Sequence, residues 1–257
     1  MAHIVARLFD MDFIFLDLFF CAVWMTVLLI RKKRLQWVFG LFGAVIVFIS
    51  DDLIWYHLQG TRVLDTVPFN NDLFLLYFSF TYGMIEFSYI ATMISAKNWK
   101  SMLSWSLFLY GGWFAIGFLS NWIHLDDRMI YIYREMASIR WIQIAMVIGG
   151  YLLLIVFKYT WKPFKDLSWL KIGYLFLIGF IVHFGMEITL FAAGIRPLDG
   201  AFSVLLFNSF LEFNSGVPVI FIAWTLLKNR GISTGSHDLN LESLESSLLT
   251  TIKKEKD

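Results

Sequence analysis

The sequence predicts an all-α, polytopic membrane protein: a bundle of seven transmembrane helices with its N-terminus outside and its C-terminus in the cytosol. Composition is the first of three observations behind this prediction. Of the 257 residues, 58% are hydrophobic and only 16% are charged, and the mean hydropathy is +0.67. A soluble domain carries roughly 25% charged residues, so this chain has too little polar surface to face water on all sides. The other two observations are seven long apolar segments and a charge difference between alternate loops.

Seven segments reach the length of about 20 residues that a helix needs to cross the hydrocarbon core of a bilayer. Backbone polar groups in lipid must be satisfied within the segment, which favours helices over open strands. Only Pro218 falls inside a segment, so we expect uninterrupted helices. The expected limits are 13–30, 36–56, 73–94, 102–123, 139–157, 170–191 and 202–226.

The charges of the loops predict the orientation of the bundle. Basic residues gather after the first, third, fifth and seventh segments, as in the run from Arg31 to Arg34. Acidic residues such as Asp65 and Asp127 gather in the other loops. The positive-inside rule therefore places the basic loops in the cytosol. Residues 1–230 then form the transmembrane domain, and 231–257 form a cytosolic tail that is either disordered or a short amphipathic helix.

Several classes of site are not expected. Cys21 is the sole cysteine, which excludes an internal disulfide and a cysteine-based metal site. The net charge of +1 gives no reason to expect a nucleic-acid partner. The phosphate-binding loop, the HExxH zinc motif, the GxSxG nucleophile motif and the CxxC pair are all missing from the sequence. A metal site built from His183, Glu187 and Glu212 would be a weak pattern, so we expect no metal and no cofactor.

The informative residues are ionisable groups inside the expected spans. Each costs on the order of 3 kcal/mol or more at the bilayer centre, so each should face the bundle interior or a cavity. Glu86, His183 and Glu212 fall near the midplane, whereas Asp51 and Glu187 fall several ångströms toward the outer side. This bias predicts a polar pocket that opens to the outer side or to the outer leaflet and is closed below.

Spacing brings these groups together. His183 and Glu187 are four residues apart and share one helix face, and Asn208 and Glu212 do the same. The loop 192–201 is short, so the last two spans should be antiparallel neighbours whose polar faces meet.

The third span carries Tyr82, Glu86 and Tyr89 in one stripe, with Glu86 on the opposite side of the expected pocket. A buried protonated carboxyl is a competent general acid, and an adjacent histidine or carboxylate can return the proton. The candidate catalytic residues are therefore Glu86, His183, Glu187 and Glu212. The candidate substrate-binding residues are Asp51, Tyr82, Tyr89 and Asn208.

A structural role is the alternative for each of these residues, because a buried Glu that bonds Tyr or Asn across helices also stabilises a bundle. Arg140 is expected to be the counter-ion of one of the carboxylates or a residue of the pocket rim.

Two resemblances point to the same chemistry. The segment from Ile181 to Glu187 resembles the His-x-x-x-Glu helix of the emopamil-binding-protein (sterol isomerase) group, and the run from Asn208 to Pro218 is similar to that group's last helix. The chain also resembles the small seven-helix membrane terpene cyclases, which carry one acid late in the second helix and one in the seventh. Asp51 or Asp52 and Glu212 occupy comparable places here.

Both families protonate an alkene in an apolar pocket and hold the carbocation with aromatic faces and carboxylates. The resemblances therefore imply a membrane-embedded isomerase or cyclase that acts by proton transfer on a hydrophobic isoprenoid or sterol-like substrate. A proton-coupled small-molecule transporter and a seven-helix ligand-binding sensor are the alternatives. In each case the expected partner is a membrane lipid or lipid-soluble small molecule, and the expected location is the plasma membrane or the endoplasmic reticulum membrane.

Overall fold

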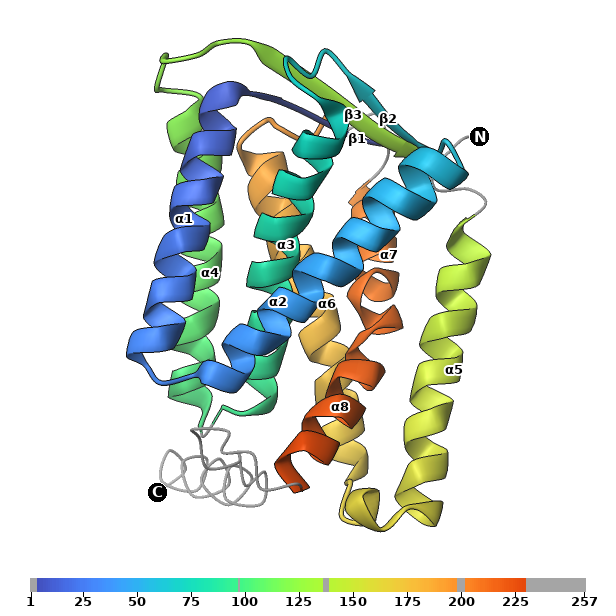
Figure 1. Cartoon of the computed structure of the whole chain (residues 1–257). Helices are drawn as coiled ribbons and strands as arrows, with labels where there is room; N and C mark the ends of the chain where they lie inside the picture. Colours follow the sequence, from blue (N-terminus) through green and yellow to red (C-terminus); the bar gives the residue numbers. More distant parts are fainter. Residues whose placement is uncertain (1–3, 97, 136–138, 198–201, 230–257) are drawn as a thin grey trace, which may run out of the picture.

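The computed structural model describes residues 4–96, 98–135, 139–197 and 202–229, and these residues are mostly helical (Figure 1). Seven helices among them are long and apolar enough to cross a membrane. The proposed tail, residues 231–257, lies outside the described residues. The first six spans are α1 (Met11–Ile30), α2 (Arg34–Phe48) with its π-helical continuation η1 (Ile49–Leu58), α3 (Asn71–Ile94), α4 (Trp99–Ser120), α5 (Ile139–Thr160) and α6 (Trp169–Ala192). The seventh comprises α7 (Phe202–Leu211), the 3₁₀ turn η3 (Phe213–Ser215) and α8 (Val217–Asn229), and a second 3₁₀ turn, η2 (Lys162–Phe164), follows α5.

The helices lie where hydropathy places the seven segments, but several begin earlier because polar caps come before the apolar run. The side chains of Asp10, Asn70 and Asn98 each accept a hydrogen bond from the backbone N–H three residues later. These caps satisfy N–H groups that have no partner within the helix. Helices α1, α3 and α4 therefore begin two or three residues before the segments predicted from apolar character alone.

The prediction of an all-α chain is wrong in one respect, because three strands form an antiparallel sheet over one end of the bundle (Figure 1). The strands are β1 (Ile4–Asp10), β2 (Arg62–Asp65) and β3 (Met129–Glu135), in the order β1-β3-β2. Successive side chains of a strand point to opposite faces. In β3 the residues Ile130, Ile132 and Arg134 are accordingly buried, and the two tyrosines between them are only half-buried.

The expectation of uninterrupted helices is also wrong, because the seventh span changes geometry between Leu211 and Val217. Pro218 has no N–H to donate to the carbonyl of Asn214, and its ring crowds that carbonyl. The Asn214 side chain offsets part of this loss: its amide donates to the Phe210 carbonyl over 3.1 Å, and its oxygen accepts from the Tyr151 hydroxyl over 2.7 Å. The interruption places Glu212 at the end of α7 rather than within a regular helix.

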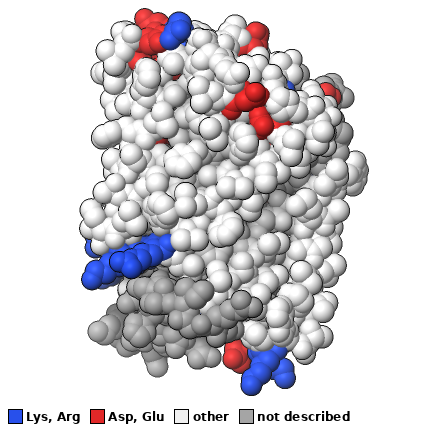
Figure 2. All heavy atoms as spheres, in the orientation of Figure 1, with Lys and Arg blue, Asp and Glu red and all other residues white. Residues whose placement is uncertain are grey.

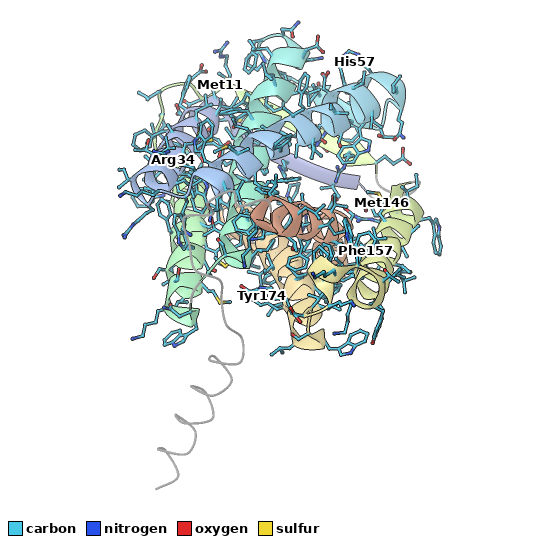
Figure 3. All side chains as sticks on the ribbon, turned by 60° about the horizontal axis from the view of Figure 1, so that its bottom comes forward. Met11, Arg34, His57, Met146, Phe157 and Tyr174 are labelled. Carbon is cyan, nitrogen blue, oxygen red and sulfur yellow. The ribbon has the colours of Figure 1, made fainter. Side chains whose placement is uncertain are left out.

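Helix α3 lies at the centre of the bundle, and 72% of its span is buried. Its closest neighbour is α2, which crosses it at glycines. A Cβ atom added to Gly83 would lie 2.4 Å from the backbone nitrogen of Ala44, and one added to Gly43 would lie 2.4 Å from the Gly83 carbonyl oxygen. The two backbones therefore touch, in the way that small residues allow in membrane helix pairs. Side chains fill the spaces between the other helices (Figure 3).

We predict that Gly83→Ala forces α2 and α3 apart and lowers the unfolding free energy by about 1–3 kcal/mol, as overpacking does. The thermal unfolding of the purified protein in detergent measures the effect. Gly149→Ala on α5 is the matched control, because a Cβ atom there meets no atom within 4 Å. That variant should be as stable as the wild type or slightly more so, since Ala favours helix over Gly. An equal loss in both variants would contradict the close α2–α3 contact.

Candidate functional site

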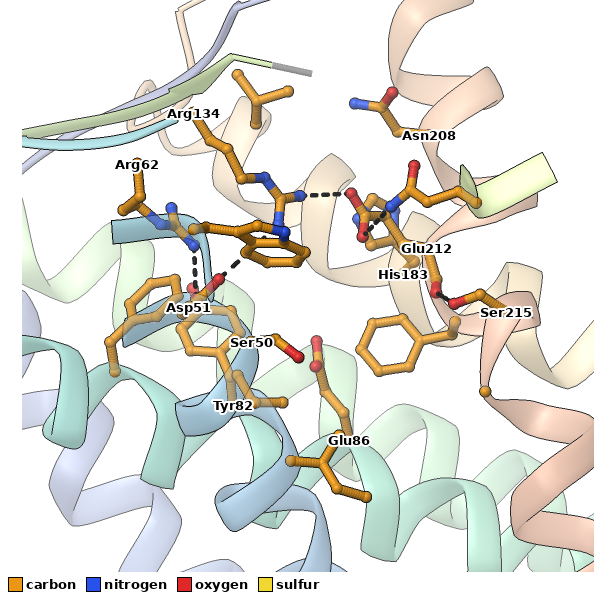
Figure 4. Close-up of a pocket in the computed structure, with 18 of the residues that line it drawn as sticks. Ser50, Asp51, Arg62, Tyr82, Glu86, Arg134, His183, Asn208, Glu212 and Ser215 are labelled. Carbon is orange, nitrogen blue, oxygen red and sulfur yellow. Dashed lines mark hydrogen bonds and ion pairs between the residues drawn. The ribbon is translucent and has the colours of Figure 1, made fainter. Parts of the chain in front are cut away.

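A cavity of about 420 Å³ lies beneath the sheet, between α2–η1, α3, α5, α6 and the interrupted seventh span (Figure 4). Its volume is within the range of small-molecule sites, roughly 300–1,000 Å³. Charged and aromatic side chains both contribute to its wall. Seven of the eight residues predicted from the sequence line it: Asp51, Tyr82, Glu86, His183, Glu187, Asn208 and Glu212.

Tyr89 is the residue that the structure does not bring to the cavity. Its ring is buried next to Trp24, and its hydroxyl lies 2.7 Å from the Ser106 hydroxyl of α4. Tyr82 and Glu86 come earlier on α3 and face the cavity. Tyr89 shares the helix face of Tyr82 but lies two turns further along α3, about 10 Å away along the helix axis, where α1 and α4 rather than the cavity adjoin α3.

The sheet supplies cations that the sequence analysis did not identify. Arg7, Arg62 and Arg134 lie on the inner face of the sheet, and all three are at least nine-tenths buried. Arg62 and Arg134 are direct cross-strand partners, an arrangement in which like charges repel. The alternation of isoleucine and tyrosine from Ile130 to Tyr133 was the signal for a strand, and its period of two places Arg134 on the same face as the isoleucines.

Asp51 of η1 lies between these two arginines and balances them. Its Oδ2 atom accepts a hydrogen bond from Arg62 over 2.5 Å, and its Oδ1 atom lies 3.8 Å from Arg134. Burial lowers the pKa of the Arg62 guanidinium, and the adjacent carboxylate opposes that shift. The guanidinium stays charged at neutral pH, because the ordinary pKa of arginine is about 12 or above.

Arg134 connects η1 to the seventh span. It donates to Glu212 over 2.5 Å, and the carboxylate of Glu212 also accepts from the Gln143 amide over 3.0 Å. The guanidinium of Arg134 lies 4.0 Å from the ring centre of Trp55, a cation–π contact that holds it in place. Two carboxylates on separate helices therefore share one arginine from the sheet.

Glu187 of α6 has a second set of cations. It pairs with Arg7 over 3.4 Å and makes a direct ion pair with Arg196, which follows α6. The imidazole of His183 lies 3.7 Å from the same carboxylate through Nε2, and its Nδ1 lies 3.1 Å from the Ser209 hydroxyl. The predicted meeting of the α6 and α7 faces is thus present, and His183 lies at its centre.

Arg140 meets the expectation of a counter-ion in part: it makes no direct ion pair with a described carboxylate, but its charge acts on that of Glu212. Arg140 is buried, and it hydrogen-bonds Asn208 directly and Gln143 over 3.1 Å. The direct ion-pair partners of the described cavity carboxylates come from the strands and from Arg196. Asn208 consequently has its side-chain oxygen occupied by Arg140.

Glu86 is the exception among the carboxyls of the cavity. It is 2% exposed, and no hydrogen bond or ion pair joins it to any described residue. Figure 4 shows its carboxyl directed into the space between Asp51 and Glu212. Tyr82 and Phe87 line the cavity beside it on α3. The site therefore holds three paired carboxylates, which act as fixed charges, and one carboxyl without a hydrogen bond or ion pair to any described residue.

We predict that Asp51→Leu lowers the unfolding free energy by about 3–5 kcal/mol, because two buried guanidiniums then repel without a carboxylate between them. Arg62→Met in the same chain should restore part of the loss, since replacing both partners of a buried pair is milder than removing one. Thermal unfolding in detergent measures all three proteins. Asp126→Asn is the control, because its ion pair with Arg128 lies on the surface. A double variant no more stable than Asp51→Leu would contradict the pairing.

The comparisons with known proteins give no family: the chain matches no family model, no curated protein and no solved structure. The resemblances drawn from short motifs therefore remain hypotheses.

Proposed function

We propose that this protein is a membrane-embedded enzyme, an isomerase or cyclase that acts by proton transfer on a hydrophobic isoprenoid or sterol-like alkene. The observation that carries the proposal is Glu86, a buried carboxyl without a partner that faces a cavity of substrate size. The other three carboxylates of the cavity are neutralised by arginines. Glu86 is thus the group best suited to donate a proton to an apolar substrate.

The surface supports insertion into a membrane with the sheet outside. Figure 2 shows acidic groups near the sheet end, basic groups toward the opposite end and a broad uncharged region between them. The described basic residues at the lower end include Arg31, Lys158 and Lys165. In this orientation the cavity lies beneath the outer surface, and the basic loops face the cytosol.

The chemistry requires only a proton donor, a proton acceptor and a wall that tolerates positive charge. A proton from Glu86 adds to one carbon of an alkene, and the electron pair of the double bond forms the new C–H bond. The neighbouring carbon becomes cationic, and the aromatic rings of Phe87 and Phe213, which also line the cavity, can stabilise it.

Loss of a proton from an adjacent carbon restores a double bond. Glu86, now a carboxylate, or His183 can accept that proton. Attack by a second double bond on the cation gives a ring instead. Neither outcome consumes an oxidant or a reductant.

The ion-pair network favours a second candidate, a proton-coupled transporter. Asp51, Arg134 and Glu212 form a continuous polar chain across the cavity. The described helices carry no Asp, Glu, Lys, Arg or His between the level of Glu86 and the basic end, for example in 101–120 and 172–182. A proton would therefore have no protein group to carry it through the lower half, and we rank this candidate second.

The orientation predicts which positions can be labelled from each side. In a Cys21→Ser background, a cysteine placed at Asp127 should react with an impermeant maleimide on intact cells. A cysteine at Lys165, also exposed, should react only after the membrane is permeabilised. The reverse pattern would place the sheet in the cytosol.

Catalysis by Glu86 predicts a loss of proton transfer in Glu86→Gln without a loss of folding. Protein in bilayer nanodiscs is incubated in D₂O with isoprenoid alkenes, and mass spectrometry detects deuterium on carbon in the product. We expect Glu86→Gln to lower incorporation by about 10²-fold or more, because general acid catalysis typically contributes 10²–10⁴-fold.

Tyr89→Phe is the matched control for that variant, since Tyr89 is buried on the same helix but lies away from the cavity. It should retain deuterium incorporation. Proton flux into liposomes tests the transporter. Flux that is unchanged in Glu86→Gln but lost in Glu212→Gln would support the transporter over the enzyme.

A further inference from the structure

Among the described residues that line the cavity, the exposed ones lie on one flank. The inward-facing residues of the sheet that line the cavity are buried or half-buried, so the sheet covers the outer end of the site. Four described lining residues are exposed, and they belong to α2–η1 or to α5: Ile46, Gln59, Ile142 and Met146. The wall is therefore open between these two helices and closed where the sheet lies.

Helix α5 is loosely held, which leaves this flank open. Only 11% of its span is buried, the lowest value among the seven spans. It packs mainly against η2, α7, η3 and α8, and α2–η1 is not among its main contacts. Figure 3 shows α5, with Met146 and Phe157 labelled, at the edge of the bundle. An opening beside such a helix lies at the level of the apolar surface, where lipid chains would be.

Polarity changes along the cavity from this opening inward. Three of the four exposed residues at the rim are apolar: Ile46, Ile142 and Met146 are 48%, 56% and 50% exposed, and the polar Gln59 lies at the end of η1. The deep end beneath the sheet holds Arg7, whose Nη1 atom is buried and has no hydrogen-bond partner. An apolar rim and an unpartnered donor at the deep end match a ligand with one polar end and one apolar chain.

We propose that the substrate is a chain-like amphiphile that enters sideways from the bilayer between α2–η1 and α5. Its polar end, such as a hydroxyl or carbonyl oxygen, lies toward the sheet arginines, and its chain passes Glu86 and leaves through the apolar rim. This inference rests on the proposed function, because it gives the substrate class and the route for the same cavity. The sequence predicted a pocket that opens either to the outer side or to the outer leaflet. The proposed route corresponds to the outer leaflet.

Photolabelling tests the route without requiring turnover. The probe is a sixteen-carbon alcohol with an alkyl diazirine near its hydroxyl, dissolved in the bilayer of nanodiscs that contain the full chain. Alkyl diazirines react well with carboxyls, so we expect mass spectrometry to find the label on Glu86. Met146→Trp narrows the rim from α5 and Ile46→Trp narrows it from α2. Each should lower the labelling of Glu86 about tenfold, which corresponds to about 1.4 kcal/mol in apparent affinity.

Leu152→Trp is the matched control, because Leu152 is 54% exposed on α5 but does not line the cavity. It should leave the labelling unchanged, and gel filtration should show all four proteins equally folded. Label confined to outward-facing residues of the helices, or equal labelling of Glu86 in all four proteins, would overturn the sideways route. Retained deuterium incorporation in Glu86→Gln would instead overturn Glu86 as the proton donor of the proposed reaction, so the two failures are distinguishable.

Discussion

The structure depends on the pairing of buried charges beneath the sheet. An ionised group taken out of water loses several kcal/mol of solvation, and it is tolerated only with a close partner of opposite charge. Asp51, Glu187 and Glu212 come from three helices, and each meets an arginine from a strand or from the segment after α6. The bundle contributes the anions and the end of the molecule contributes most of the cations, so neither part satisfies its charges alone.

This pairing gives the sheet a role beyond covering the bundle. β1, β2 and β3 come from three distant parts of the chain, and their inward arginines connect them to η1, α6 and α7. The helices also depart from regular geometry at the same level. The second span becomes π-helical around Asp51, and the seventh changes to a 3₁₀ turn just after Glu212. Such departures are frequent at functional sites, because they re-aim side chains that a regular helix would direct elsewhere.

The unpaired carboxyl and the open flank follow from the same arrangement. The described arginines of the sheet end are engaged with other carboxylates, and Glu86 lies deeper on α3, near Phe87 and Phe213. The sheet covers the polar end of the cavity. The cavity is therefore open on its apolar side, between α2–η1 and α5. The proposed proton donor and the proposed access from the lipid phase would suit the same kind of substrate, one that dissolves in the bilayer.

Local chemistry in the sequence determined the number and position of the spans, because twenty apolar residues and their caps act within one segment. Helical spacing likewise placed His183 with Glu187 and Asn208 with Glu212. The tertiary structure determined the interaction partners of those side chains. Hydropathy and loop charge treat residues 4–10, 62–65 and 129–135 as loops, since each strand forms only by pairing with another far along the chain. The partners of the carboxylates, the isolation of Glu86 and the placement of Tyr89 away from the cavity all depend on that long-range pairing and packing, which no single segment encodes.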